Sequence, residues 1–258
     1  MELRKVLSVT DITSIKIAVI KFTGKFFDVF GNPQKKGRWF VWGESGSGKS
    51  SFIFQLLKEF ARTEKTLLVT NEEERSDEAF QDRFNLFNMH DVKDNLQVID
   101  KESLQHLAER LRKRNSAQVI IIDSVPYMFI YKGLTLQDYF DFVEEFSDRL
   151  IVFIGHAEGK KPATEFERRI MYDATQKVFV SGYVATNKGR KFGPYSNQFI
   201  IWKKGYEDLM GAKNLEAKLQ DNLKRLLKLF KTKYGHSDEA ILDKIEANEI
   251  ELTFNDNE

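Results

Sequence analysis

Residues 38–50 read Arg-Trp-Phe-Val-Trp-Gly-Glu-Ser-Gly-Ser-Gly-Lys-Ser, and this stretch decides the fold. Its last eight residues match the pattern G-x-x-x-x-G-K-[ST], and the apolar run before them predicts a strand that leads into the loop. Glycine lets the backbone curl so that several N–H groups meet on one anion, and a helix beginning near Lys49 directs its partial positive charge there. The stretch therefore predicts a loop that binds the phosphates of a nucleoside triphosphate. The predicted binding residues are Gly43, Glu44, Ser45, Gly46, Ser47, Gly48, Lys49, Ser50 and Ser51.

Strand and helix signals alternate beyond this loop. Helical spacing of apolar residues predicts helices at 49–62, 76–88, 102–114 and 135–147. Short apolar runs predict strands at 66–70, 96–99, 119–123 and 150–154. The segments 177–185 and 198–202 predict two later strands, antiparallel at the edge. The expected fold class is α/β, with a mainly parallel central sheet flanked by helices.

Composition restricts the class of protein. A length of 258 residues suits one α/β domain with an extension, or at most two domains. The net charge of +1 excludes an overall basic field that would by itself indicate a nucleic-acid partner. The absence of cysteine excludes disulfides and cysteine-ligated zinc. Because the start lacks the apolar core of a signal peptide and no run of about 18 apolar residues occurs, we expect a cytoplasmic protein without a membrane partner.

Three regions are expected along the chain. Residues 1–37 form an N-terminal extension that packs on the core, in which 15–22 could be a strand. Residues 38–207 form the core, and 208–258 form a helical segment with an acidic tail. The helix predicted at about 208–232 carries seven basic and two acidic residues between Lys213 and Lys233. A packing helix with a solvated basic face is the simpler interpretation, and a protein-binding or DNA-facing helix is the alternative.

One residue outside the loop completes a nucleotide and metal site. Lys49 is expected to bridge the β- and γ-phosphates, and the Ser50 hydroxyl is expected to ligate Mg2+. Asp123 ends the apolar run Val119–Ile122, and a buried strand that ends in Asp is the usual second half of such a site. The predicted cofactors are therefore ATP and Mg2+, with Ser50 and Asp123 as the metal ligands.

An acidic segment follows the next predicted strand. Thr70-Asn71-Glu72-Glu73-Glu74 places carboxylates at the carboxyl edge of the sheet, beside the phosphate loop. A glutamate at this position can polarise a water molecule for attack on the γ-phosphate. Glu72 is the candidate base because it lies nearest the strand end, and Glu73 is the reserve. An exposed acidic turn is the alternative interpretation.

The order of these motifs resembles the RecA-type ATPase core, with its RadA, KaiC and replicative-helicase branches. Residues 69–73 resemble the strand that carries that family's catalytic glutamate, and residues 119–125 are similar to its second nucleotide motif. Ile154-Gly155-His156 ends the next strand, where the family has a polar sensor. Residues 187–193 look like its Lys-Asn-Arg-Phe-Gly motif with an altered order. The layout, over roughly residues 36–205, also resembles compact RecA-like ATPases of phages and mobile elements.

The resemblance implies an assembly. Members of that family work as rings or filaments with ATP between neighbouring subunits. Lys188, Arg190 or Lys191 would then be the cation supplied in trans to the γ-phosphate, and His156 would sense that phosphate. An ordinary basic turn and a structural histidine are the alternative interpretations of these residues.

The resemblance also implies contact with single-stranded DNA through two loops. The first, residues 127–134, contains Phe129, Tyr131 and Lys132, and the second, residues 155–169, contains Lys160, Lys161, Arg168 and Arg169. Cations neutralise phosphates and aromatic rings stack on bases, so both ingredients are present. Ordinary solvated loops have the same composition.

Three functions remain open. The leading hypothesis is an oligomeric, Mg-dependent RecA-type ATPase that acts on single-stranded DNA in recombination, annealing or repair. The second is a KaiC-like or adaptor ATPase whose nucleotide state controls a protein partner without DNA. The third is a P-loop kinase, against which the position of Glu72 argues.

Overall fold

The computed structural model describes residues 6–191 and 193–234 of the chain. The chain divides into two compact units, Met1–Lys203 and Lys204–Glu258. The first unit contains the sheet and the phosphate loop. The second unit begins within a long helix.

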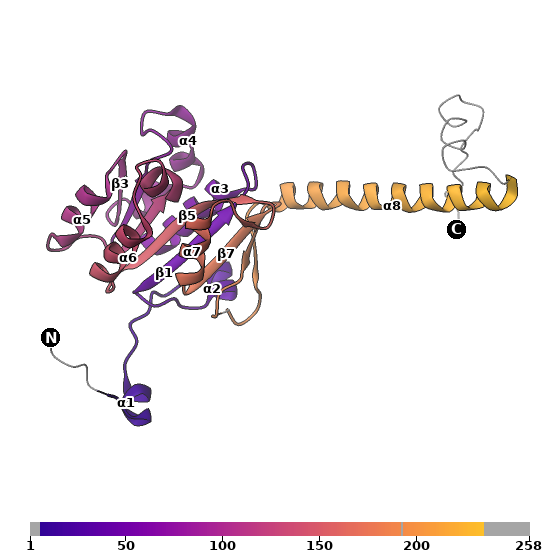
Figure 1. The fold of residues 1–258 in the computed structure, drawn as a ribbon. Coiled ribbons are helices and arrows are strands. Elements are labelled where there is room, and N and C mark those ends of the chain that lie inside the picture. Colours follow the sequence, from indigo (N-terminus) through magenta and orange to yellow (C-terminus); the bar gives the residue numbers. More distant parts are fainter. Residues whose placement is uncertain (1–5, 192, 235–258) are drawn as a thin grey trace. The chain divides into compact units, whose positions relative to one another are not determined.

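The first unit is built on a nine-stranded sheet, counted over the described residues, in the order β3-β2-β4-β5-β1-β7-β8-β9, with β6 paired to β5. Neighbouring strands from β3 to β7 are parallel, and β8 and β9 continue the sheet antiparallel. Figure 1 shows β1 between β5 and β7. The strands are β1 (Gly37–Gly43), β2 (Thr66–Thr70), β3 (Leu96–Asp100), β4 (Val119–Asp123), β5 (Leu150–Glu158), β6 (Lys161–Pro162), β7 (Gln176–Ser181), β8 (Val184–Asn187) and β9 (Gln198–Ile200). The predicted fold class, α/β with a mainly parallel central sheet, flanking helices and antiparallel edge strands, is confirmed.

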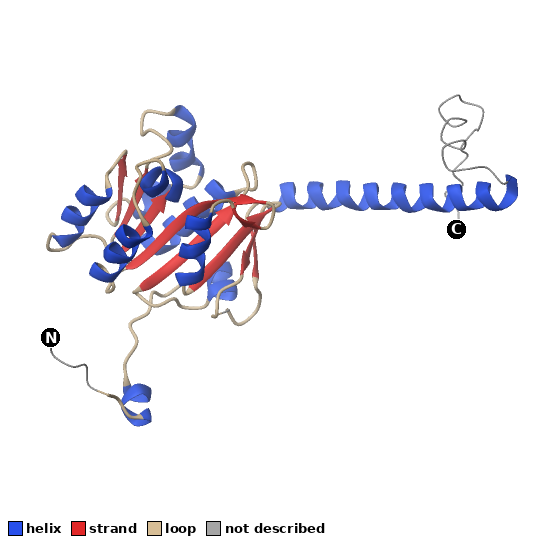
Figure 2. Ribbon diagram, in the orientation of Figure 1, coloured by secondary structure: helices blue, strands red, loops and turns tan. Residues whose placement is uncertain are grey.

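Helices alternate with the parallel strands (Figure 2). Their starts follow local chemistry, since the side chains of Asp77, Ser103, Thr135 and Thr164 each accept a bond from a first-turn N–H. The helices are α1 (Val9–Ser14), α2 (Gly24–Phe30), α3 (Lys49–Ala61), α4 (Glu78–Leu86), α5 (Leu104–Arg112), α6 (Leu136–Glu145), α7 (Glu165–Asp173) and α8 (Lys203–Tyr234). A 3-10 turn η1 (Met89–Val92) and a π-helical turn η2 (Pro126–Ile130) complete the elements.

Side chains that alternate along the strands form two apolar cores, one on each face of the sheet. On β1, Trp39 and Val41 pack with α2, α3 and α4, whereas Phe40 and Trp42 pack on the face covered by α5, α6 and α7. The side chains of Val119–Ile122 are completely buried between the two layers. Because both faces are covered, the carboxyl edge of the sheet is the natural place for polar side chains to gather.

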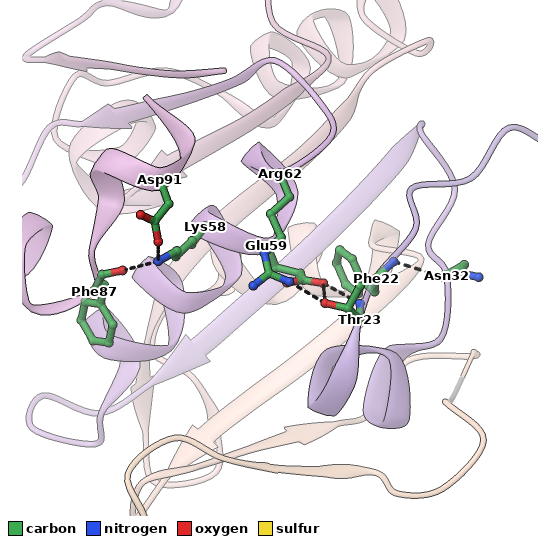
Figure 3. A network of polar contacts seen from close by, with 8 residues as sticks. All are labelled: Phe22, Thr23, Asn32, Lys58, Glu59, Arg62, Phe87 and Asp91. Atoms are coloured by element: carbon green, nitrogen blue, oxygen red, sulfur yellow. Dashed lines mark hydrogen bonds and ion pairs between the residues drawn. The ribbon is translucent and has the colours of Figure 1, made fainter. Parts of the chain in front are cut away.

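The N-terminal extension is held on α3 by a polar network (Figure 3). The Thr23 backbone N–H and hydroxyl donate to the buried Glu59 carboxylate at 2.6 and 3.0 Å, and Arg62 donates to the Thr23 hydroxyl at 2.6 Å. Beside Glu59 in the sequence, the Lys58 ammonium donates to the Phe87 carbonyl at 2.9 Å and pairs with Asp91 at 2.7 Å. The same helix that begins at the phosphate loop therefore anchors two other segments of the unit.

Several local expectations are corrected. Residues 15–22 do not form a regular strand, because only Val19 finds a partner, in a single bridge to Gln34. The predicted strand 177–185 is two antiparallel strands, β7 and β8, separated by a turn at Gly182 and Tyr183. Of the predicted α-helices, 76–88, 102–114 and 135–147 are each present with shorter bounds.

The two loops predicted to contact DNA are more ordered than expected. Residues 126–130 close a π-helical turn in which the Tyr131 N–H donates to the Pro126 carbonyl at 2.9 Å, and Phe129 is buried in the core. The segment 155–169 continues β5 to Glu158, returns as β6 and enters α7 at Glu165. Thr164 starts α7 because its hydroxyl and the Glu167 carboxylate cap each other's backbone.

The second unit contributes one described element, since α8 runs through the predicted helix 208–232 to Tyr234. The acidic tail at 235–258 lies outside the described residues, as do Phe192 and the side chains of Leu215, Leu219, Leu226 and Phe230. Among the described residues, every helix is too short or too polar to span a bilayer.

Candidate active site

The phosphate loop joins β1 to α3. Gly48 precedes the helix with a φ of 93°, a left-handed conformation that favours glycine. No side chain caps the first turn of α3, so the N–H groups that an α-helix leaves without internal partners are available at this end. Lys49 and Ser50 are the first two residues of the helix. This is the backbone arrangement that binds a phosphate group.

Three predicted residues gather beside the loop because parallel strands end at one edge. Asp123 ends β4, in register with Thr70 on β2 and Ile154 on β5. His156 lies opposite Gly43, where β1 enters the loop. Glu72 follows β2, and its Oε2 atom lies 3.4 Å from His156 Nε2.

A cavity of about 720 Å3 opens over the phosphate loop, Glu72 and His156. Its lining consists of Gly43, Glu44, Ser45, Gly46, Gly48, Lys49, Ser50, Ser51, Glu72, Glu73, His156, Ala157 and Tyr183. Of the predicted loop residues only Ser47 is missing from this lining, and its buried hydroxyl has no partner among the described residues.

The charges at the site are coupled. The hydrogen bond to Glu72 raises the pKa of His156, and the same bond, helped by the charge of Lys49, lowers the pKa of Glu72. Burial and then the negative charge of Glu72 raise the pKa of Asp123 to about 7. The charge of Lys49 opposes this rise, and a buried carboxyl group at the end of β4, among these charges, suits a divalent ion bound with the phosphates. Ser50 and Asp123 would be the protein ligands of that ion, and it would neutralise charge on the phosphates.

The structure separates Glu72 from the reserve candidate Glu73. The Glu73 carboxylate forms an ion pair with Arg83 of α4, and the Arg83 guanidinium lies 5.3 Å above the Phe54 ring. Glu74 pairs with Lys101. Glu72 is the member of the acidic turn whose carboxylate contacts His156, and it is directed to the site rather than to a neighbouring helix.

A buried glutamate that sequence reasoning missed holds the carboxyl end of β5. Glu167 Oε1 accepts the His156 backbone N–H at 2.8 Å, and Oε2 accepts the Thr164 N–H and hydroxyl at 2.9 and 2.8 Å. The Glu167 side chain is fully buried. The pattern Thr164-x-x-Glu167 was the available signal, since a capping box marks the start of a helix. It does not reveal the second bond, to His156.

The hairpin of β5 and β6 is also tied to the phosphate loop. The Gly159 N–H donates to Glu44 Oε1 at 3.1 Å, and the Trp42 indole N–H donates to the Lys160 carbonyl at 3.2 Å. The segment 155–169 therefore contacts the phosphate loop through Glu44 and holds the His156 backbone through Glu167.

Of the three cations predicted to act in trans, Arg190 and Lys191 lie away from their own phosphate loop. The Lys188 ammonium lies 4.9 Å above the Phe179 ring. Arg190 and Lys191 line a cavity at the amino end of β1, the end opposite to the phosphate loop, and Lys191 donates to the Asn32 carbonyl at 2.5 Å. Any contact between these cations and a γ-phosphate would have to involve a second copy of the chain.

The residues predicted to contact DNA differ in their surroundings. The Tyr131 side chain is 68% exposed. The Lys132 ammonium donates to the Glu102 carbonyl at 2.8 Å, and burial lowers its pKa. Arg168 and Arg169 both pair with Glu165, at 2.8 and 3.0 Å. Lys160 and Lys161 are exposed and form no ion pair within the described part of the chain.

Similar proteins were found by structure only. No protein-family model matches the sequence, and no curated protein is significantly similar to it. The flagellar accessory protein FlaH of Methanocaldococcus jannaschii superposes with a TM-score of 0.54 at 16% identity, over 71% of this chain and 93% of FlaH. A KaiC-like protein of Pyrococcus horikoshii superposes with a TM-score of 0.51 at 17% identity, over 71% of this chain and 93% of its own. These likenesses establish a shared fold.

Proposed function

We propose that this chain binds ATP with Mg2+, hydrolyses it, and acts as a nucleotide-dependent switch. The observation that carries the proposal is the convergence of the phosphate loop, Glu72 and His156 on one cavity at the carboxyl edge of the sheet, with Asp123 at the end of the neighbouring strand β4. The same fold in FlaH and in a KaiC-like protein is consistent with it.

Each residue of the site has a separate role in the proposed hydrolysis of ATP. Lys49 and the N–H groups of the phosphate loop bind the phosphates, and bound Mg2+ neutralises the charge that develops on them. Glu72 accepts a proton from a water molecule while the oxygen of that water attacks the γ-phosphorus. The bond between the γ-phosphorus and the β–γ bridging oxygen breaks, and ADP leaves with that oxygen. The lowered pKa of Glu72 keeps it ionised at neutral pH, as a base requires. His156 orients the Glu72 carboxylate.

Single-stranded DNA is the second candidate effector. Exposed Tyr131, Lys160 and Lys161 support it, since they offer a ring for stacking and charges for phosphates. The engagement of Lys132 with the Glu102 carbonyl, and of Arg168 and Arg169 with Glu165, leaves fewer cations for a DNA backbone. For this reason we place the protein-directed switch first.

The deciding experiment is ATP hydrolysis by the wild type and Glu72→Gln, with and without single-stranded DNA, at low and moderate salt. A switch hydrolyses ATP at the same rate with and without DNA. Stimulation that is lost in Lys160→Ala/Lys161→Ala, with a flatter salt dependence of DNA binding, would establish the DNA-directed function instead. A wild type that neither binds nor hydrolyses ATP would refute both.

We further propose self-association into a ring or filament, with ATP between subunits. The position of Arg190 and Lys191, at the end of the sheet opposite to their own phosphate loop, supports a role in trans. The test mixes Lys49→Ala, which keeps these cations, with Arg190→Ala, which keeps the phosphate loop. Recovery of hydrolysis in the mixture is expected, and hydrolysis that never exceeds the sum of the separate variants would exclude Arg190 as the trans residue.

The basic helix α8 would offer a surface for a protein partner in such an assembly.

A further inference from the structure

The cavity over the phosphate loop has one aromatic residue in its lining, Tyr183. This residue lies on the β7 side of β1, away from Glu72 and His156, which come from the strands on the other side. The binding of phosphates and of a metal ion explains the presence of the phosphate loop and of the acidic groups. The ring of Tyr183 has no part in that chemistry.

The backbone at Tyr183 is unusual for a large side chain. β7 and β8 are joined by Gly182 and Tyr183, whose φ angles are 56° and 60°. Positive φ at both central residues is the type I′ geometry of two-residue hairpins, which favours Asn and Gly. Tyrosine is disfavoured there because its Cβ crowds the backbone. A bulky residue kept at a strained position beside a ligand cavity points to a role for its side chain.

Several contacts hold this turn against the phosphate loop. The Tyr183 N–H donates to the Ser47 carbonyl at 3.0 Å, and its carbonyl accepts the Ile201 N–H at 2.9 Å. A Cβ added to Gly48 would lie 3.0 Å from Tyr183 Cδ1, so the ring packs directly on the loop. The Trp202 ring meets Tyr183 edge-on, with centroids 5.1 Å apart, and is half exposed. The ring is thus fixed at the mouth of the phosphate site.

We propose that Tyr183 is the stacking platform for the base of the bound nucleotide, buttressed by Trp202. This inference rests on the proposed function, because the triphosphate in the loop determines where the base can lie. A base has two apolar faces, and a fixed aromatic ring beside the phosphates provides a matching surface. Stacking depends little on base identity, so Tyr183 provides affinity for a nucleoside triphosphate over an inorganic triphosphate.

The test compares two ligands, ATP and inorganic tripolyphosphate, by calorimetry with Mg2+ present. In Tyr183→Gly, which removes the ring and suits the left-handed backbone, ATP affinity should fall roughly 5- to 100-fold, the range expected for one lost stacking contact. The affinity for tripolyphosphate should stay within about twofold, since the charges at the loop are unchanged. Tyr183→Phe should bind ATP like the wild type, because stacking does not need the hydroxyl.

Tyr172→Ala is the matched control, since Tyr172 is an exposed tyrosine on α7 outside the cavity lining, and it should leave both affinities unchanged. An equal loss for both ligands in Tyr183→Gly would overturn the proposal, because the ring would then act only by shaping the phosphate loop. Unchanged ATP binding would overturn it as well. A wild type that binds neither ligand would refute the proposed function itself. A wild type that binds both ligands equally tightly would keep the phosphate site and overturn the stacking proposal.

Discussion

The two sides of the phosphate loop carry different chemistry. On one side, Asp123 ends β4, Glu72 follows β2, and His156 lies in β5 opposite Gly43; we call these three residues the charged flank. On the other, the β7–β8 turn and the residue after Ile201 present Tyr183 and Trp202, the aromatic flank. The charged flank is made of groups whose pKa values are coupled, whereas the aromatic flank is made of rings fixed by backbone bonds. The difference suggests that turnover depends on one flank and nucleotide affinity on the other.

The largest effect is expected on the charged flank. Glu72→Gln removes the base but keeps the shape of the side chain, so turnover should fall roughly 100- to 10,000-fold with ATP affinity retained. Single-turnover hydrolysis together with calorimetric ATP binding would measure both quantities. The control is Glu73→Gln, which should keep its turnover because Glu73 pairs with Arg83. If Glu73→Gln were the inactive variant, the base would be the neighbouring residue and the charged flank would be misassigned.

The phosphate loop lies between the two flanks. Removing its lysine should lower the affinity for every ligand that carries phosphate groups. Lys49→Ala removes a charge-assisted contact, so the affinities for ATP and for tripolyphosphate should both fall roughly 10- to 150-fold. Lys65→Ala is the matched control, because Lys65 precedes β2 at the opposite end of the sheet. Calorimetry with both ligands makes the comparison. Tight binding by Lys49→Ala would contradict the phosphate-loop assignment.

The aromatic flank should give a smaller effect that is confined to affinity. Trp202→Leu keeps apolar bulk but loses the edge-to-face contact with Tyr183, which is worth about 0.5–1.5 kcal/mol in such pairs. ATP affinity should therefore weaken roughly 2- to 10-fold while turnover at saturating ATP stays unchanged. Steady-state kinetics over a range of ATP concentrations separate the two. A fall in turnover at saturation would mean that the flanks are not independent.

The charged flank was predictable from the sequence because parallel strands end at one edge. The apolar runs placed Asp123 and His156 at strand ends, and Glu72 followed from the strand before it. The aromatic flank was not predictable in this way. The segment 177–185 reads as one apolar strand, and its turn depends on a backbone conformation that Tyr183 rarely adopts. The role of Glu167 was hidden for a similar reason, since its bond to His156 arises only in the folded chain.

The smallest effect concerns the pairing of His156 with Glu72 in the absence of nucleotide. The pKa of His156 is raised above 6.5, so its contribution to stability is complete below that pH and is lost as the pH rises through the raised pKa. The pKa of Glu72 is lowered below 4.5, so its contribution is present above that pH and is lost as the pH falls through the lowered pKa. The pair therefore stabilises the fold most between pH 4.5 and 6.5.

Urea unfolding of the wild type and His156→Gln measures this contribution. At about pH 5.5 the wild type should be more stable by about 0.5 kcal/mol, the size expected for an ion pair whose side chains are over one-third exposed, and at about pH 8.5 the difference should vanish. The same comparison in an Asp123→Asn background removes the titration of Asp123, whose pKa responds to the charge of His156. A difference of the same size at both pH values would show that His156 acts through packing. The ion pair between His156 and Glu72 would then contribute nothing to the stability of the protein without nucleotide.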